Sequence, residues 1–266
     1  MAFAAETEKR SDILDIVETL NGLSVVQVDV IRAIIHRFAD EQFGELVRPG
    51  DFLTLEAYEY FSMRLAAHHA YSASVLKKEN FEHILEEAFS RTGVPAKRAS
   101  SMTMRGADLT VGGVTLSLKT EAARNLSMDF ITISKLMEAA WIKQTTCADD
   151  VPGFVASMVM PHFGNYDRIF TLRSYPDRER RGFVRYDLRE IPKQVLSAVG
   201  DLRGEDFTAP TRTRTTSADV VIDGRRAFRF RLDGSDDKLT INYLDVRLCP
   251  LHAWWSLSAP GLDREG

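Results

Sequence analysis

The chain has 266 residues, of which 44% are hydrophobic and 27% are charged, as in an ordinary globular protein with a buried core. It has no apolar run long enough to span a membrane, and its first residues lack the basic-then-apolar order of a signal peptide. Its two cysteines, Cys147 and Cys249, lie far apart without metal-binding spacing. These features argue against a membrane protein and a zinc site, and they predict a cytoplasmic protein.

The net charge of −4 is unevenly distributed. Residues 1–60 carry 5 basic and 12 acidic side chains, whereas the remaining residues have a net charge of +3. The segment from Arg168 to Arg189 holds seven arginines and three acidic residues. A basic face of this kind can bind phosphates, so the acidic total does not exclude a nucleic-acid partner.

Residues 1–78 are predicted to form an N-terminal helical region. Ser24 begins a capping box, and apolar residues then repeat at helical spacing toward Phe38. A further helix is expected from about Thr54 toward His69. The region from 79 to 200 opens with one more helix, near 79–91, and then changes to the two-residue alternation of strands.

The alternation begins in 107-ADLTVGGVTLSLKTEA-122, which predicts two strands around a turn at Gly112-Gly113. Residues 201–217 are polar and predict a linker or a mobile loop. A β-rich region, 201–266, follows and is expected to belong to the same compact domain. The other predicted elements are strands at 168–175, 183–190, 219–222, 226–232 and 238–246, and helices at 127–144 and 192–200. This order predicts an α/β (α+β) fold with a mixed central sheet flanked by helices.

The predicted hairpin places polar side chains on one face. With a two-residue turn, Asp108 opposes Ser117, and Lys119 lies diagonally from Asp108 on the same face. A carboxylate and an ammonium around one site suit Mg²⁺ binding and phosphate chemistry. A solvated strand face with a surface ion pair is the alternative, and on this stretch alone it is favoured.

Glu82, on the preceding helix, is expected at the edge that faces the sheet. An acid on a helix, then Asp and Lys on successive strands, is the element order of PD-(D/E)xK nucleases. Beyond this order, the chain resembles the SmaI family of type II restriction endonucleases from about His68 to Trp255. The runs that carry the resemblance are 117-SLKTEAARNLS-127, 134-SKLMEAAW-141, 165-NYDRIFTLR-173 and 188-LREIPKQVL-196.

The resemblance implies a restriction-endonuclease-like fold and a homodimeric, Mg²⁺-dependent endonuclease of a prokaryotic cytoplasm. It implies cleavage of both strands of double-stranded DNA at a short GC-rich palindrome, which for the family's namesake is CCCGGG cut to blunt ends. A cognate DNA methyltransferase acts on the same site and need not bind this protein.

By position, the resemblance makes Asp108 the metal carboxylate, Lys119 the catalytic lysine and Glu82 the helix acid. Ser117 stands where the general nuclease motif has its second acid. Glu121 is then an alternative ligand, although the strand geometry separates it from Asp108 by roughly 13 Å. If Glu121 is not a ligand, the predicted metal ligands are Asp108, Glu82 and the backbone carbonyl of Leu118. Glu121 then holds Lys119 or a water. Glu138, on the following predicted helix, is a less favoured ligand.

The expected DNA contacts lie after the catalytic strand and in the terminal hairpin, where two arginines of one strand face can enter a DNA groove. They are Ser134, Lys135, Arg173, Arg225, Arg229 and Arg231. Two other functions remain open at this point. Because Ser117 removes one expected acid, a nuclease-fold protein that binds DNA without cutting is the first. An intracellular interaction protein with a merely solvated hairpin is the second.

Overall fold

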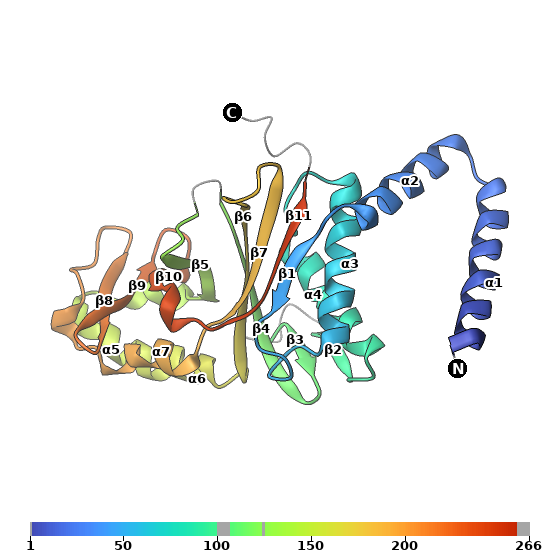
Figure 1. The fold of residues 1–266 in the computed structure, drawn as a ribbon. Helices are drawn as coiled ribbons and strands as arrows, with labels where there is room; N and C mark the ends of the chain where they lie inside the picture. Colours follow the sequence, from blue (N-terminus) through green and yellow to red (C-terminus); the bar gives the residue numbers. More distant parts are fainter. Residues whose placement is uncertain (1, 100–106, 124–125, 260–266) are drawn as a thin grey trace.

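The computed structural model describes residues 2–99, 107–123 and 126–259, with side chains from Asp12 onward. It contains a seven-stranded sheet in the order β1-β11-β7-β6-β4-β3-β2 and a four-stranded sheet in the order β5-β10-β9-β8 (Figure 1). Strands β4 and β6 are parallel, and the other neighbours are antiparallel, so the larger sheet is mixed.

The strands are β1 (Phe43–Leu46), β2 (Ala96–Arg98), β3 (Leu109–Val111), β4 (Val114–Ala122), β5 (Phe130–Glu138), β6 (Arg168–Pro176), β7 (Phe183–Glu190), β8 (Thr216–Ile222), β9 (Arg225–Asp233), β10 (Lys238–Asp245) and β11 (Leu251–Ser258). The α-helices are α1 (Ala2–Asn21), α2 (Val25–Ala39), α3 (Leu55–Tyr71), α4 (Lys78–Arg91), α5 (Val151–Phe154), α6 (Met160–Phe163) and α7 (Lys193–Ser197). Within the described ranges, no helix is long and apolar enough to cross a membrane.

The two helix starts predicted at Ser24 and near Thr54 are confirmed. The Ser24 hydroxyl accepts from the backbone N–H of Gln27, and the Gln27 side chain accepts from the backbone N–H of Ser24, which closes the capping box of α2. The Thr54 hydroxyl accepts from Ala57 N at 3.2 Å and caps α3. Each such cap contributes about 1 kcal/mol to helix stability.

Each sheet has a hydrophobic core of its own. In the larger sheet, α3 and α4 cover one face, and Phe81 of α4 packs with Leu116 and Leu118 of β4 in one buried cluster. In the smaller sheet, Ile133 and Phe230 are buried in a second cluster with side chains of residues 141–163 and α7. Full burial of each of these large side chains is worth roughly 1.5–3 kcal/mol. The boundaries predicted at residues 78 and 200 stay a prediction.

The predicted hairpin is confirmed in type and register. Val111 pairs with Val114 and Thr110 with Thr115. Gly112 and Gly113 have φ of +55° and +88°, the left-handed region that a side chain disfavours. The turn therefore places Asp108 one pair beyond the Leu109–Leu116 pair and level with Ser117, as the sequence predicts.

The helix predicted at 127–144 is wrong. Residues 130–138 form β5, which pairs with β10. Ile133 pairs with Ile241 and Met137 with Leu239, so β5 has four steps where β10 has two. This bulge breaks the two-residue alternation and buries positions 131, 133 and 136. The resulting three-residue spacing resembles that of a helix, and β10 lies too far along the chain for a local pattern to reveal it.

Other predicted elements are confirmed. Strands β6, β7, β8, β9 and β10 cover the predicted strand segments, and α7 with the short 3-10 turn after it covers the predicted helix near 192–200. Asp223 and Gly224 have φ of +50° and +72°, as a two-residue hairpin turn requires.

The segment 201–217, predicted as a linker or a mobile loop, contacts the smaller sheet. Phe207 is buried in the second core, and Thr208 N donates to Ser217 O at 2.9 Å.

Candidate active site

The first turns of α4 and the start of β3 bring two carboxylates together. Glu82 lies one turn after Lys78 on α4, and Asp108 immediately precedes β3. The Lys78 ammonium lies between them, 2.7 Å from Asp108 Oδ1 and 3.2 Å from Glu82 Oε1. Two of the four carboxylate residues named from the sequence therefore face one point, and a cationic group lies at it.

Strand β4 supplies the neighbouring groups. Leu118 N donates to Asp108 Oδ2 at 2.6 Å, and Ser117 Oγ donates to the same oxygen at 3.4 Å. In a strand, the N–H and the carbonyl of one residue point to the same side. The Leu118 carbonyl therefore lies on the Asp108 side of β4. Ser117 holds Asp108 by a hydrogen bond from the position where the general motif has an acid.

Lys119 lies on β4, two residues after Ser117 and on the same strand face. Burial lowers the pKa of Lys119 to about 8, Asp108 and Glu82 oppose this shift, and Lys78 and Lys135 add to it. Among the described residues, no carboxylate lies within ion-pairing distance of the Lys119 ammonium. The lysine that forms an ion pair with Asp108 is therefore Lys78 and not Lys119.

Three residues near this site were not predicted from the sequence. Of the three, Lys78 is the one that the sequence could best have indicated, because its spacing to Glu82 is i, i+4 on a helix. Burial and the charge of Lys119 lower the pKa of His162. Burial and the charge of Asp108 raise the pKa of Tyr166. No sequence pattern links residues 162 and 166 to the hairpin, since the parallel pairing of β4 with β6 brings them there.

Glu121 is engaged in a different arrangement, which joins the two sheets. Its Oε2 lies 2.7 Å from Arg173 Nε, and its Oε1 accepts from Thr132 N of β5 at 2.8 Å. The Arg173 guanidinium also donates to the carbonyls of Ser127 and Phe130. Both carboxylate oxygens of Glu121 are thus committed to the protein, away from the Asp108–Glu82 pair.

Arg173, predicted as a DNA contact, is 0% exposed. A buried guanidinium with a carboxylate and two carbonyls as partners is not presented to DNA. Separating the Arg173 guanidinium from the Glu121 carboxylate would leave an unpaired buried charge, which costs about 3–5 kcal/mol. Arg173 is therefore not a DNA contact, and this prediction is wrong. Its side chain instead links β6 to Glu121 of β4 and to the backbone at the start of β5.

The other predicted DNA contacts lie at the surface of the smaller sheet. Ser134 and Lys135 are exposed in the bulged part of β5 rather than on a helix, and Lys135 forms an ion pair with Glu138. Arg225, Arg229 and Arg231 lie along β9. Arg229 pairs with Asp219 at 2.7 and 3.0 Å, Arg231 lies 3.7 Å from Asp233, and Arg225 is exposed.

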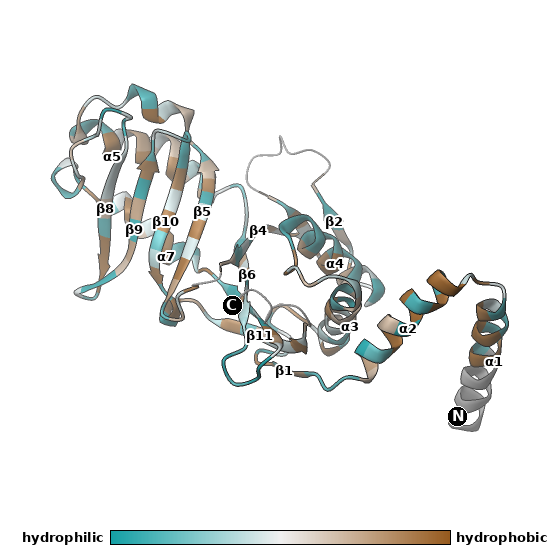
Figure 2. Ribbon diagram, turned by 90° about the horizontal axis from the view of Figure 1, so that it is seen from above, coloured by the Kyte–Doolittle hydropathy of each residue, from teal (hydrophilic) through white to brown (hydrophobic). Residues whose placement is uncertain are grey.

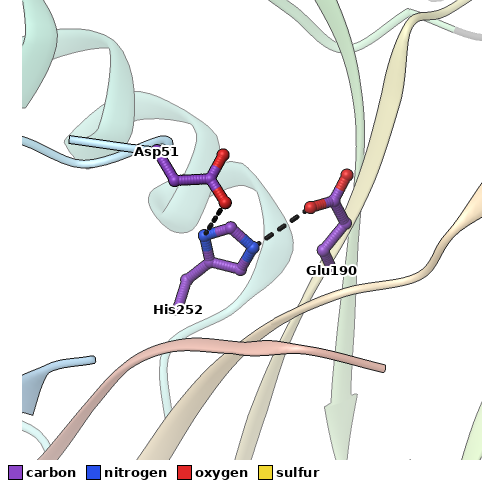
Figure 3. Close-up of side chains that lie close together, drawn as sticks. All are labelled: Asp51, Glu190 and His252. Carbon is purple, nitrogen blue, oxygen red and sulfur yellow. Dashed lines mark hydrogen bonds and ion pairs between the residues drawn. The ribbon is translucent and has the colours of Figure 1, made fainter. Parts of the chain in front are cut away.

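A second group of metal-ligating residue types lies on the larger sheet. Asp51, Glu190 and His252 each offer a ligand atom within 4.8 Å of the others (Figure 3). Arg168 already pairs with both carboxylates: it donates twice to the Glu190 carboxylate, at 2.6 and 2.9 Å, and once to the Asp51 carboxylate at 3.0 Å. His252 Nε2 lies 3.1 Å from Glu190 Oε2. This group is an ion-pair network that ties the loop before α3 to β6, β7 and β11.

The network predicts a pH-dependent contribution to stability. Burial by itself would raise the pKa of Glu190, but hydrogen bonds from His252 and Arg168 outweigh it and lower the pKa to about 2. Because the pKa is depressed in the folded state, the contribution is complete above the ordinary pKa of 4.5 and is lost as the pH falls toward 2.

Glu190→Gln is therefore expected to lower the free energy of unfolding at pH 7 by about 2–3 kcal/mol. The difference from the parent protein should shrink as the pH falls from 4.5 to 2, as measured by urea denaturation at several pH values. Glu205→Gln, at an exposed position, is the control. A Glu190→Gln protein as stable as the parent at pH 7 would contradict this assignment.

A mixed sheet flanked by helices, with an acid on a helix beside Asp and Lys at successive strands, defines the class: the protein has the restriction-endonuclease-like fold of a nuclease. The comparisons with known proteins agree. The family described as "Type II site-specific deoxyribonuclease", SmaI, matches residues 16–257. The chain belongs to this SmaI family and is a type II site-specific deoxyribonuclease whose substrate is DNA.

A curated enzyme and a solved structure are among the proteins that the chain matches. The "Type II restriction enzyme SmaI" of Serratia marcescens is 31% identical over 217 residues, which cover 79% of this chain and 83% of that protein. A solved "Restriction endonuclease in complex with substrate DNA" is 13% identical, with a TM-score of 0.29, and the match covers 51% of this chain and 54% of that one.

Proposed function

We propose that the protein hydrolyses phosphodiester bonds in both strands of double-stranded DNA, with Mg²⁺ as cofactor, at a short GC-rich palindrome. CCCGGG is the expected sequence, because it is the site of the SmaI namesake that the chain resembles. The observation that carries the proposal is the convergence of Asp108 and Glu82 on one cationic group beside the half-buried Lys119. Its place of action is the cytoplasm of a prokaryotic cell.

The residues present fit a hard divalent cation. Asp108 and Glu82 provide carboxylate oxygens around a point that already holds a positive charge, and Leu118 provides a carbonyl on the same side. Oxygen ligands of this kind are those that Mg²⁺ prefers, and the described site has no thiolate. When bound, the ion supplies polarisation of a phosphate oxygen and lowers the pKa of a bound water.

Lys119 has the electrostatic part of the work. Its side chain is half-buried, and in such surroundings a fixed positive charge stabilises developing negative charge more strongly than in water. During hydrolysis, negative charge accumulates on the scissile phosphate as the water attacks. Ser117 and Leu118 N hold Asp108 in place by hydrogen bonds, and Glu121 holds β4 to β5 through Arg173.

The smaller sheet is proposed to contact DNA beyond the scissile bond. Ser134 and Lys135 of β5 are exposed, and the charge of Lys135 acts on Lys119, so this part of β5 lies near the site. Phosphate contacts are the proposed role of these two residues. Arg225, Arg229 and Arg231 of β9 are proposed to reach the groove, where Arg229 must exchange Asp219 for a base or a phosphate.

We further propose that the working unit is a homodimer formed through α1 and α2. The two helices extend away from the sheets (Figure 2), and α2 contains no buried residue. Apolar side chains exposed on them include Ile13, Leu14, Val25 and Val26, the last two 76% and 72% exposed. From Asp12 onward, where its side chains are described, α1 has three acidic residues and no basic one, and α2 has one acidic residue and two arginines. This complementarity favours α1 of one copy against α2 of the other, and reading a palindrome calls for two-fold symmetry.

The double substitution Leu14→Glu with Val26→Glu is expected to convert the dimer to a monomer and to reduce cleavage of a palindromic duplex at least tenfold, since buried charges oppose association. The helix content of the variant, measured by circular dichroism, should fall by no more than α1 and α2 contribute to that of the parent. Light scattering gives the mass of the free protein and of its DNA complex. Leu55→Glu, at an exposed site on α3 and outside the proposed DNA contacts, is the control. A parent protein that is monomeric both free and on DNA would overturn the dimer.

Digestion of a plasmid of known sequence tests the activity. With Mg²⁺, discrete fragments are expected whose ends map to one palindrome, and a duplex with a scrambled site should remain intact. Excess EDTA should stop cleavage, and Ca²⁺ should permit binding with little cutting because it polarises water less. Full activity in EDTA would exclude the metal-dependent mechanism, and ends at unrelated sequences would exclude the specificity.

A further inference from the structure

Lys78 occupies the point on which the two candidate metal carboxylates converge. Its ammonium lies 2.7 Å from Asp108 Oδ1 and 3.2 Å from Glu82 Oε1, as close as a hydrogen-bonded ion pair. Glu82 and Asp108 are 18% and 21% exposed, so this pairing is screened less than one at the open surface. A metal ion and the Lys78 ammonium therefore compete for the same two oxygens.

The charges at the site balance while Lys78 is present. Asp108 and Glu82 contribute two negative charges, and Lys78 and Lys119 contribute two positive ones. A divalent cation entering this group gains attraction to the carboxylates but also meets two ammonium groups. Without Lys78 at the site, the remaining three groups carry a net charge of −1. The electrostatic affinity for a cation must then be higher.

Lys78 can leave the site without disturbing the fold. It is the first residue of α4, its side chain is 36% exposed, and its four-carbon stem is flexible. Helix α4 is fixed by Phe81 and Leu85, both buried in the first core, so Glu82 stays in place when the lysine turns away. The displaced ammonium remains within a side-chain length of the site and can meet a DNA phosphate there.

We propose that Lys78 is a built-in competitor of the metal ion, which holds Asp108 and Glu82 together in the DNA-free protein and transfers to a phosphate when DNA binds. The proposal rests on the proposed metal-dependent cleavage and deepens it. Metal affinity then depends on DNA: it is weak in the free enzyme and stronger in the complex, since the phosphate provides a new partner for the ammonium. Lys78 is in this sense a positioning residue for the two carboxylates.

Calorimetric titration with Ca²⁺, which is expected to bind without cleavage, tests the competition directly. In the absence of DNA, Lys78→Met should bind Ca²⁺ on the order of tenfold more tightly than the parent, as expected when a partly exposed ion pair no longer has to be broken. Lys77→Met makes the same chemical change one residue earlier, where the side chain is exposed and makes no cap contact, and should leave the affinity unchanged. Lys78→Gln, checked for folding by circular dichroism, serves as a second variant.

The same titration on a duplex containing the palindrome tests the transfer. DNA should increase the Ca²⁺ affinity of the parent more than that of Lys78→Met, because only the parent has an ammonium to release. Equal affinities of Lys78→Met, Lys78→Gln and the parent, free and on DNA, would overturn the proposal. Asp108→Asn separates this failure from a failure of the metal site: if Asp108→Asn loses Ca²⁺ binding, the site stands without the competitor, and if it does not, the proposed metal site itself is wrong.

Discussion

Replacing Lys119 by alanine is expected to reduce the rate of DNA cleavage at least about a hundredfold while leaving DNA affinity largely intact. Lys119 is half-buried beside Asp108 and Glu82, where a fixed charge acts more strongly than in water on the charge that develops at the scissile phosphate. In the ground state it contributes one phosphate contact among many. Single-turnover cleavage gives the rate, and binding in Ca²⁺ gives the affinity.

Lys135→Ala is the matched control, because this lysine also affects the pKa of Lys119 but is exposed and paired with Glu138. Its cleavage rate should change by less than about tenfold, as for the loss of one phosphate contact. If Lys119→Ala cuts at nearly the parent rate, the mechanism proposed for this site is excluded, whatever the role of the fold.

Asp108→Asn is expected to abolish Mg²⁺-supported cleavage, because it removes the carboxylate proposed as a metal ligand. This carboxylate accepts hydrogen bonds from Lys78 Nζ, Ser117 Oγ and Leu118 N. DNA binding without metal should persist or become tighter, since a negative charge that repels phosphate is gone. Cleavage at increasing Mg²⁺ and filter binding in EDTA measure the two effects. Substantial cleavage by Asp108→Asn at ordinary Mg²⁺ would contradict its assignment as a metal ligand.

Glu121→Gln distinguishes a metal ligand from a residue that supports the strand. Glu121 contacts Arg173 and Thr132 N, so its substitution should lower stability by about 3 kcal/mol and activity only partly, with recovery at higher Mg²⁺ or Mn²⁺. A Glu121→Gln protein that folds like the parent but is as inactive as Asp108→Asn would return Glu121 to the metal site.

Local signals were sufficient for the elements whose partners are near in sequence. The Gly112-Gly113 turn determines the register of its own hairpin, and the caps at Ser24 and Thr54 determine where two helices begin. These features depend on backbone conformations that a few residue types favour. They could therefore be predicted without knowledge of the rest of the chain.

Strand β5 could not be predicted in this way. Its bulge opposite β10 produces buried positions at the spacing of a helix, and the pairing that stabilises it comes from about a hundred residues later in the sequence. Strand β1 is a similar case: Glu45 pairs with Trp254, 209 residues away. Tertiary pairing decided β5 against its local pattern and formed β1 where no local pattern predicted a strand.

The candidate site shows the same division. Asp108 and Lys119 follow from the hairpin register and the resemblance to the family, and Glu82 follows from its helix. The pairing of Lys78 with Asp108 and the burial of Arg173 depend on how helices and strands pack, which no spacing in the sequence expresses.

The position of β11 has a consequence for the time at which the protein becomes complete. It lies between β1 and β7 in the larger sheet, so the seven-stranded order cannot form until residues 251–258 have been synthesised. Pairings of such long sequence separation are slow to form. A nascent or prematurely terminated chain already carries Asp108 and Lys119 but lacks the strand that joins β1 to the rest of the sheet. The complete seven-stranded sheet is therefore available to DNA only after β11 has been synthesised.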